Sequence, residues 1–457
     1  MRRKTSGIWR GLLAVSLLLG LTLSLTVPAQ AATEGEIQTA IDAGLVWLVA
    51  QQNADGSWGD YNPVGVTAFA VKKLEHHAVD DKYGYGLDSP YDPAYPYVSN
   101  LTAGLNYIFA NAYTMPISPQ PAGDPDTNGN GIGVYFSSPG ETHQVYETGV
   151  ALMAIAESTA PDRVVDVPGS PVNGWTYYEV AEDAMNYLAF GQNDAGDERG
   201  GWGYYENSVG YSCNSNSGYA VLGFQYAQAA PPEGFAMPIP QFVKDELCIW
   251  IEHIQCDPGD PGYTADRDGG SGYYNGSPCY WVNVLKTGNL LKEMEFAGGD
   301  CGRQQAAIDY LVGHWGDNAD PGWRPNHYQA MYTVTKGLVA NGYIDPAVID
   351  GIYWQDDFDD AIVTQQADGH WSDCPRYCWD TVPGDCEPAT DILCTAWALL
   401  TLEKAVPPPP EEPPEEPPQA PPGIPTLSYW GIIAMAAVFA GLLGWSVRRR
   451  TSGADGR

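Results

Sequence analysis

Residues 52–59 read QNADGSWG, and residues 365–371, near the other end of the chain, read QQADGHW. Each copy follows an apolar segment with helical spacing and precedes a second apolar segment. Asp-Gly favours a turn, because glycine accepts a positive φ and aspartate bonds the backbone ahead of it. The Trp after the turn can bury its ring between neighbouring units while its indole N–H finds a partner. The block therefore predicts a joint between paired helices.

The same organisation recurs along residues 32–406. Residues 34–52 place apolar side chains at helical spacing on one face, whereas residues 64–74 are apolar on nearly all sides. This contrast predicts a half-exposed first helix and a buried second helix in each unit. The predicted hairpins are 34–52 with 64–74, 98–113 with 142–158, 180–190 with 217–229, 241–254 with 279–292, 303–314 with 328–340, and 349–366 with 389–404. We therefore expect an all-α body of six hairpins, an inner ring lining a barrel and an outer ring shielding it.

The two blocks resemble the QW motifs of the squalene–hopene and oxidosqualene cyclases, and residues 395–400, TAWALL, resemble the inner helix that follows such a motif. These cyclases belong to the α/α-toroid superfamily, with the protein prenyltransferase β subunits and the complement-type thioester domains. The resemblance covers most of residues 34–405 and implies an α/α toroid. It implies more about fold than about activity.

Both ends of the chain carry export signals. Residues 1–31 combine a basic start, an apolar run over 12–25 and a small-residue cleavage site at 29–31, which is typical of a signal peptide. Residues 407–423 are rich in Pro and Glu and predict a semi-rigid linker. Residues 429–447 carry no charge and are long enough to cross a bilayer. The arginines at 448–450 predict that the C-terminal tail, 451–457, is cytoplasmic.

Residues 424–431 read IPTLSYWG, and with the apolar segment and the Arg cluster they resemble the bacterial IPTL-CTERM sorting signal. This signal is a relative of the PEP-CTERM signals. Over residues 424–450 the resemblance implies an envelope protein that an exosortase-type enzyme processes at the membrane or that stays anchored there. The chain has a net charge of −34, which disfavours nucleic acid and anionic lipid as partners.

Nine cysteines lie in the second half of the exported part, a distribution that predicts disulfides. Local pairs such as Cys248 with Cys256, and pairs within residues 374–394, are the expected bridges. The odd number leaves one thiol over. No cysteine spacing matches a zinc knuckle.

Four chemistries known on this fold can be compared with the sequence. Triterpene cyclisation needs an acid in an Asp-x-Asp-Asp arrangement, and residues 357–360, DFDD, fit its letters. They lie on a predicted outer helix, however, where a solvated acidic face is the competing interpretation. Asp359, Asp360 and Asp391 are therefore the catalytic candidates. A zinc site as in the prenyltransferases has His143, Glu147, His327, Asp391 and Cys394 as candidate ligands, without the family's Asp-x-Cys pattern.

Two further chemistries rest on short motifs. Cys301 and Gln304 keep the spacing of a thioester motif, but Arg303 replaces its Glu. Asp124, Asp126 and Asn128 resemble the start of an EF-hand loop and are weak calcium candidates, because position twelve is Tyr135 and not Glu. An Asx-rich turn is the alternative interpretation of that loop.

The starts of the inner helices carry aromatic and polar side chains that predict a funnel for an apolar or glycan-like ligand. The alternative is a barrel filled by the same side chains. The candidate cavity residues are His143, Tyr146, Glu147, Tyr219, Trp281, His327, Tyr328 and Trp397. We thus predict an exported, membrane-anchored module that binds an extracellular ligand without the catalytic residues of its enzyme relatives. The alternatives are a terpene-cyclase-like or other lyase or transferase activity and a thioester-type surface adhesin.

Overall fold

The structure, a computed structural model, describes residues 31–404 except 209, 277, 299–300, 318–321, 324, 345 and 379–385. The chain divides into two compact units, Met1–Pro409 and Pro410–Arg457, and the described residues belong to the first. The predicted signal peptide, linker, IPTL-CTERM-like segment and tail fall outside the described residues, apart from residue 31. Within the described part, no helix is both long and apolar enough to cross a membrane.

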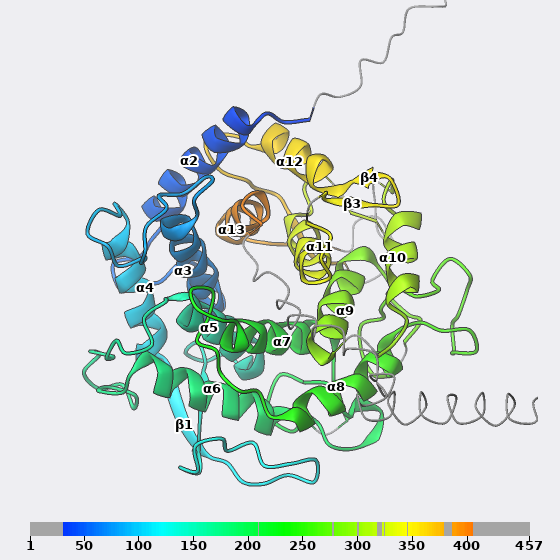
Figure 1. The fold of residues 1–457 in the computed structure, drawn as a ribbon, viewed down its shortest axis with the longest axis horizontal. Helices are drawn as coiled ribbons and strands as arrows, with labels where there is room; N and C mark the ends of the chain where they lie inside the picture. Colours follow the sequence, from blue (N-terminus) through cyan, green and yellow to red (C-terminus); the bar gives the residue numbers. More distant parts are fainter. Residues whose placement is uncertain are drawn as a thin grey trace, which may run out of the picture. The chain divides into compact units, whose positions relative to one another are not determined.

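Twelve α-helices of the described chain alternate between an outer and an inner ring (Figure 1). The inner helices contact one another in chain order, α13 contacts α3, and α12 contacts α2, so both rings close. The outer helices are α2 (Glu34–Ala50), α4 (Val98–Ala110), α6 (Tyr177–Gly191), α8 (Gln241–Ile254), α10 (Gln304–Gly313) and α12 (Trp354–Gln365). The inner helices are α3 (Pro63–Val79), α5 (Gln144–Glu157), α7 (Asn214–Gln228), α9 (Val284–Ala297), α11 (Tyr328–Ala340) and α13 (Asp391–Leu402). The predicted α/α toroid of six hairpins is confirmed.

The inner helices are more buried than the outer ones, as the pattern of apolar residues along each helix predicts. In the first hairpin, α2 buries 6 of its 17 residues and α3 buries 14 of 17. A helix with one apolar stripe can only cover the ring from outside, whereas a helix apolar on all sides must be enclosed. The capping box of Thr33 and Glu36 fixes the start of α2, and Pro63 begins α3 at a position where its missing N–H costs nothing.

The Asp-Gly-Trp turn is a hydrogen-bonded joint between three helices. Gln52 donates to the carbonyl of Gly56 in the turn (2.9 Å) and to that of Asn100 in the next outer helix (2.9 Å). Trp58 is fully buried, and its indole N–H donates to a carbonyl in the last turn of α2 (2.8 Å). Its backbone N–H donates to the hydroxyl of Thr67 on α3 (2.8 Å). The block at 52–59 therefore ties an outer helix to its own inner helix and to the next hairpin.

The same hydrogen bonds recur elsewhere in the ring, including at hairpins whose sequence lacks the Gln-x-x-Asp-Gly-x-Trp pattern. A glutamine after an outer helix donates to the following outer helix, and a buried indole donates back to the preceding one. Gln366 donates to Ala40 of α2 (2.7 Å), so the last joint closes the ring onto the first helix. The other bonds of these two kinds run from Gln192 to Val243 and Gly200, from Gln255 to Arg303 and Gly269, from Trp202 to Leu188 and from Trp371 to Ile362.

Three small antiparallel sheets interrupt the helical pattern. The long loop predicted in the second hairpin contains β1 (Ala112–Pro116) and β2 (Ile132–Phe136), paired with Ala112 opposite Phe136. The other two sheets pair β3 (Val348–Ile349) with β4 (Ile352–Tyr353), and β5 (Pro375–Cys378) with β6 (Cys386–Pro388). All three lie in connections between helices, so they decorate the toroid without changing its topology.

Disulfides join parts of the second half of the ring. Cys374 pairs with Cys394, as one of the pairings expected within residues 374–394. The expected pair of Cys248 and Cys256 is wrong, because Cys248 bonds Cys301 and Cys256 bonds Cys279. Cys248 lies within α8, which continues to Ile254, so helical rise alone carries the chain about 9 Å from Cys248 before Cys256, beyond the usual reach of a disulfide. Cys213 is buried with a free thiol.

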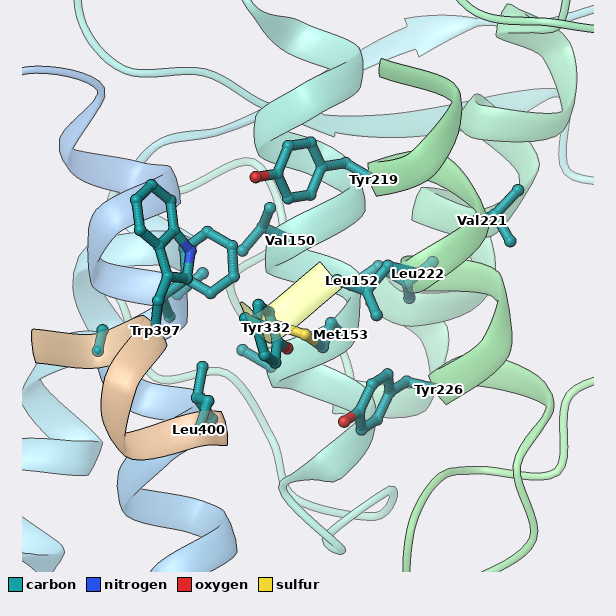
Figure 2. Close-up of a cluster of buried hydrophobic side chains, with 14 of the residues drawn as sticks. Val150, Leu152, Met153, Tyr219, Val221, Leu222, Tyr226, Tyr332, Trp397 and Leu400 are labelled. Atoms are coloured by element: carbon teal, nitrogen blue, oxygen red, sulfur yellow. The ribbon is translucent and has the colours of Figure 1, made fainter. Parts of the chain in front are cut away.

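Buried hydrophobic side chains of several inner helices cluster inside the ring (Figure 2). Phe69 makes edge-on contacts with Tyr219, Tyr332 and Trp397 at ring-centroid distances of 6.0 to 6.1 Å. These four side chains, which we call the aromatic layer, come from four inner helices and meet inside the ring. The alternative of a filled barrel therefore holds at this level. The open space lies at the end where the inner helices begin.

Candidate functional site

Two adjoining cavities lie at the N-terminal ends of the inner helices. One is formed by α7, α9, α11 and the loop before α9, with an empty volume of about 490 Å³ that includes its opening to solvent. The other is formed by α3, α5, α7, α11, α13 and the loop before α3, and its empty volume, which also includes its opening to solvent, is about 320 Å³. Tyr219 and Gln329 line both. We call the two together the mouth cavities, since they share these two residues.

The lining combines aromatic faces with amides and hydroxyls. The larger cavity is lined by Asn214, Ser215, Tyr219, Tyr273, Trp281, Asn283, Leu285, Lys286, Asn289, Gln329 and Thr333. The smaller is lined by Tyr61, Asn62, Val66, Tyr146, Tyr219, Gln329, Leu393 and Trp397. No Asp or Glu belongs to either lining in the described part of the chain, and Lys286 is its charged member. The surface is thus suited to a ligand that offers both hydrogen-bonding groups and flat apolar faces.

Local backbone structure places these groups. The side chain of Asn283 accepts from the backbone N–H of Lys286 (3.1 Å) and caps α9. Asn214, in the first turn of α7, donates to the carbonyl of Lys286 (3.0 Å) and accepts from Asn289 (3.1 Å), so α7 and α9 are joined at the cavity wall. Trp281 has a φ of 56°, an outlier for a bulky side chain, so the surrounding loop must hold its backbone in this conformation.

Three buried polar atoms of the lining lack a hydrogen-bond partner among the described residues. They are the indole nitrogen of Trp397, the side-chain oxygen of Asn62 and the side-chain oxygen of Gln329. An unpaired buried polar atom is costly, and in native structures it calls for a ligand, a water or a functional reason. One donor and two acceptors are thus available to a molecule in the mouth cavities. The sequence offered no signal for this, because pairing depends on tertiary neighbours.

Burial also sets the protonation state of the cavity. Burial raises the pKa of Tyr219 to about 12, although hydrogen bonds with Gln329 and Tyr146 act in the opposite direction. Its hydroxyl therefore stays neutral at physiological pH and can both donate and accept. The ring of Tyr219 packs edge-on against Tyr146, with 4.5 Å between the centroids. This contact holds the tyrosine at the point where the two cavities meet.

Four of the eight candidate cavity residues line the mouth cavities, namely Tyr146, Tyr219, Trp281 and Trp397. Glu147 is instead fully buried, where it accepts from the backbone N–H of Ser138 (2.7 Å) and from the Ser138 hydroxyl. Burial raises the pKa of Glu147 to about 7, while bonds from Ser138 and the backbone of Gly65 oppose the rise. Its role is to join the β2–α5 loop to the start of α3.

The remaining three candidates also face elsewhere. His143 precedes α5 and lies near Glu141 (3.6 Å) and the ring of Tyr204, with 5.0 Å between the centroids. His327 is buried and caps α11 through its Nδ1 atom, which accepts from Ala330 (3.4 Å). Tyr328 is buried and packs edge-on against Trp371. Within the described residues, no three His, Cys, Asp or Glu side chains are grouped to hold a metal ion, so the zinc candidates do not converge.

The catalytic candidates lie away from the mouth cavities. Asp359 and Asp360 are on the outer helix α12, where Asp359 is buried and accepts from Gln355 (2.6 Å). Asp391 begins α13 with a half-exposed side chain, 3.8 Å from His370. None of the three is in either cavity lining.

The thioester candidate is corrected by the structure. The Sγ atom of Cys301 is bonded to that of Cys248, so no thiol remains to attack the amide of Gln304. Gln304 begins the outer helix α10 and donates to Asn341. The disulfide instead ties α8 to the segment that precedes α10.

The calcium candidates form a self-bonded turn. The carboxylate of Asp126 accepts from the backbone N–H groups of Gly129 (2.9 Å) and Gly131 (2.8 Å), and that of Asp124 accepts from the N–H of Asp126 (3.2 Å). Asn128 donates to Asp183 on α6 (2.8 Å). These bonds match the Asx-rich turn expected as the alternative. They also explain the spacing of Asp and Asn that suggested an EF-hand.

Three comparisons with known proteins complement this geometry. The profile of the IPTL-CTERM motif matches residues 422–450. The chain thus carries an IPTL-CTERM sorting motif, of the kind recognised by exosortase-type enzymes, which indicates a protein sorted to the cell envelope or surface. The search of curated proteins found no match.

Among solved structures, the chain is similar to the GH76A α-1,6-mannanase of Salegentibacter sp. HEL1_6. The two share 13% identity over 82% of this chain and 98% of the mannanase, with a TM-score of 0.45. An inactive variant of that enzyme in complex with α-1,6-mannotriose gives 12% identity, the same coverage and a TM-score of 0.44. A protein from Actinoplanes gives 15% identity over 81% of this chain and 99% of its own, with a TM-score of 0.37.

Proposed function

We propose that the protein is a surface-sorted binding module whose toroid takes a polyhydroxylated ligand, of the oligosaccharide class, in the mouth cavities. The observation that carries this proposal is the set of unpaired polar atoms on Asn62, Gln329 and Trp397. A sugar hydroxyl donates and accepts at once, so a row of hydroxyls can pair with an indole N–H and two amide oxygens. The rings of Tyr273 and Trp281 supply apolar faces for the sugar rings.

The lining favours binding over hydrolysis. Glycoside hydrolysis needs two carboxyl groups beside the bond that is cleaved, and terpene cyclisation needs a strong acid at the substrate. In the described part of the chain no carboxyl group lines the mouth cavities. A terpene-cyclase-like or other lyase or transferase activity would have to use groups away from these cavities, such as Asp359 or Asp391. The amides, by contrast, are placed for binding.

The C-terminal segment supports an anchored position for this module. Residues 424–450 would be read by an exosortase-type enzyme, and residues 429–447 would form a single membrane span with a cytoplasmic tail before processing. The signal peptide, 1–31, would send the toroid out of the cytoplasm, and the linker, 407–423, would hold it away from the membrane. The disulfides Cys248–Cys301, Cys256–Cys279 and Cys374–Cys394 suit such an oxidising location.

A glycan array followed by calorimetry on the purified toroid tests the proposal. For a glycan that binds, Trp397→Phe removes an unpaired donor and should weaken affinity by about fivefold or more. The matched control is Trp371→Phe, whose indole N–H is already paired with a carbonyl of α12 (2.7 Å). That control should lose stability but keep its affinity within about twofold. Absence of any glycan binding, or an equal loss in both variants, would refute the proposal.

A further inference from the structure

The mouth cavities carry a positive charge within a strongly acidic protein. Lys286 lines the larger cavity, and two more lysines, Lys292 and Lys336, lie deeper on the same two helices. No carboxylate lines either cavity in the described residues, although the chain as a whole has 56 acidic against 22 basic residues. A local excess of lysines in such a protein is not explained by solubility, because surface acids already serve that purpose.

The two deeper lysines are beneath the cavity floor by helix geometry. On α11, Gln329, Thr333 and Lys336 follow one another at i, i+4 and i+7 and share one face. On α9, Asn289 and Lys292 are three residues apart and share a face in the same way. Helical side chains lean toward the N-terminus, so both lysines lean toward the mouth cavities.

Contacts agree with this placement. The Nζ atom of Lys336 lies 5.6 Å from the ring centroid of Tyr219, which lines both cavities, and 4.5 Å from that of Tyr332. It is fully buried with no hydrogen-bond partner among the described residues. Lys292 is also buried and donates to the backbone carbonyl of Gly218, next to Tyr219. A buried amine without a hydrogen-bond partner, placed next to a tyrosine that lines both cavities, is available to a negative charge that arrives there.

We infer that the ligand of the mouth cavities carries a carboxylate, as in an oligosaccharide of uronic acids, and that Lys286, Lys292 and Lys336 together supply its countercharge. This inference rests on the proposed function, because it specifies the chemical class of the same ligand. Lys286 stands at the cavity wall, where it can contact the carboxylate directly. Lys292 and Lys336 act from below through a medium of low polarity, where charge is felt over a longer range.

The protonation of the two deeper lysines adds a second observable. Burial lowers the pKa of Lys292 to about 7, although the neighbouring Glu293 opposes the fall. Burial and the charge of Lys292 lower the pKa of Lys336 well below its usual range. The groups that face Lys336 are Tyr219 on α7, Tyr332 on α11 and Lys292 on α9. An arriving carboxylate raises the pKa of both lysines, so binding near pH 7 must take up protons.

The experiment compares uronic acid oligosaccharides, such as oligomers of galacturonate, glucuronate and mannuronate, with their methyl esters, which differ only in charge. Calorimetry in buffers of different ionisation enthalpy measures affinity and proton uptake together. We expect the wild type to bind at least one acid about tenfold more tightly than its ester, with proton uptake for the acid alone. Lys336→Met should reduce this preference to about threefold or less, and Lys82→Met, which changes an exposed lysine, should keep it.

The outcomes separate the two proposals. Equal binding of acid and ester by the wild type would overturn the inference and leave the proposed function standing. Binding of neutral glycans alone would do the same. Binding of neither class would overturn both. The comparison of acid with ester uses the wild-type protein, so it remains decisive even if a lysine variant does not fold.

Discussion

Replacement of Glu403 by glutamine should destabilise the protein in a manner that depends on pH. Glu403 ends α13 and is fully buried, where it forms an ion pair with Lys73 of α3 and accepts from Nδ1 of His77 (2.9 Å). These contacts join the last inner helix to the first. Burial alone would raise the pKa of Glu403, but the charge of Lys73 and the bond from His77 outweigh burial and hold it at about 2.

The magnitude follows from that pKa. A fall from the ordinary value of 4.5 to about 2 corresponds to about 3 kcal/mol of stabilisation by the ionised form. Because the folded-state pKa is depressed, this stabilisation is complete above about pH 5 and is lost as the pH falls toward 2. Glu403→Gln also leaves Lys73 buried without its partner, which brings the expected loss at pH 7 to about 3–5 kcal/mol.

Urea denaturation followed by tryptophan fluorescence measures the effect. The free energy of unfolding of wild type minus that of Glu403→Gln should be largest at pH 7 and should shrink between pH 5 and the lowest pH at which both proteins fold. The double variant Lys73→Met with Glu403→Leu should lose less than Glu403→Gln, because it removes both buried charges. A difference that stays constant from pH 7 to pH 3, or falls below about 1 kcal/mol at pH 7, would refute the reasoning.

Three further predictions concern single features of the ring. Gly56→Ala should lower the free energy of unfolding by about 1–3 kcal/mol, because φ is +92° there and a Cβ would lie 2.4 Å from a carbonyl oxygen of α4. The control Gly35→Ala should not lower the free energy of unfolding, because a Cβ at Gly35 would meet nothing within 4 Å. Burial raises the pKa of Asp359 to about 7, so ionisation of this side chain costs stability as the pH rises from about 4 to 7. Asp359→Asn removes that cost and should raise the free energy of unfolding at pH 8 by on the order of 1 kcal/mol or more. Replacement of both Cys374 and Cys394 by Ser should lower the free energy of unfolding by about 3 kcal/mol, as measured by urea denaturation.

The architecture of the ring was predictable because it depends on local patterns. The contrast between one apolar stripe in residues 34–52 and an apolar surface all round in residues 64–74 decides which helix faces solvent. The first inner helix was nevertheless expected to end at residue 74, whereas α3 continues to Val79. Lys72 and Lys73 are tolerated inside because Glu157 and Glu403 pair with them from other hairpins, a pairing that no local pattern reveals.

The sequence predicts the kinds of residue that line the mouth cavities, but not which side chains face them. Aromatic residues at the starts of inner helices indicated an aromatic funnel, yet Tyr328 packs outward on Trp371 while its neighbour Gln329 faces both cavities. Adjacent helical residues point about 100° apart, so an error of one residue in helix phase exchanges a wall residue for a core residue. The unpaired state of the Gln329 oxygen has no sequence signal, since it depends on which residues surround it in the folded chain.

The joints also explain why the cavities lie at this end of the toroid. Each joint fixes the end of an outer helix against the start of an inner one, so the chain between the turn and the inner helix is held at both ends and can vary in length. After the first joint this segment contributes Tyr61 and Asn62 to the smaller cavity, and after the fourth it contributes Trp281 to the larger. The Gln and Trp contacts that follow α2, α6, α8 and α12 thus support loops that are free to specialise. The feature that identifies the fold therefore also positions the side chains that we propose bind the ligand.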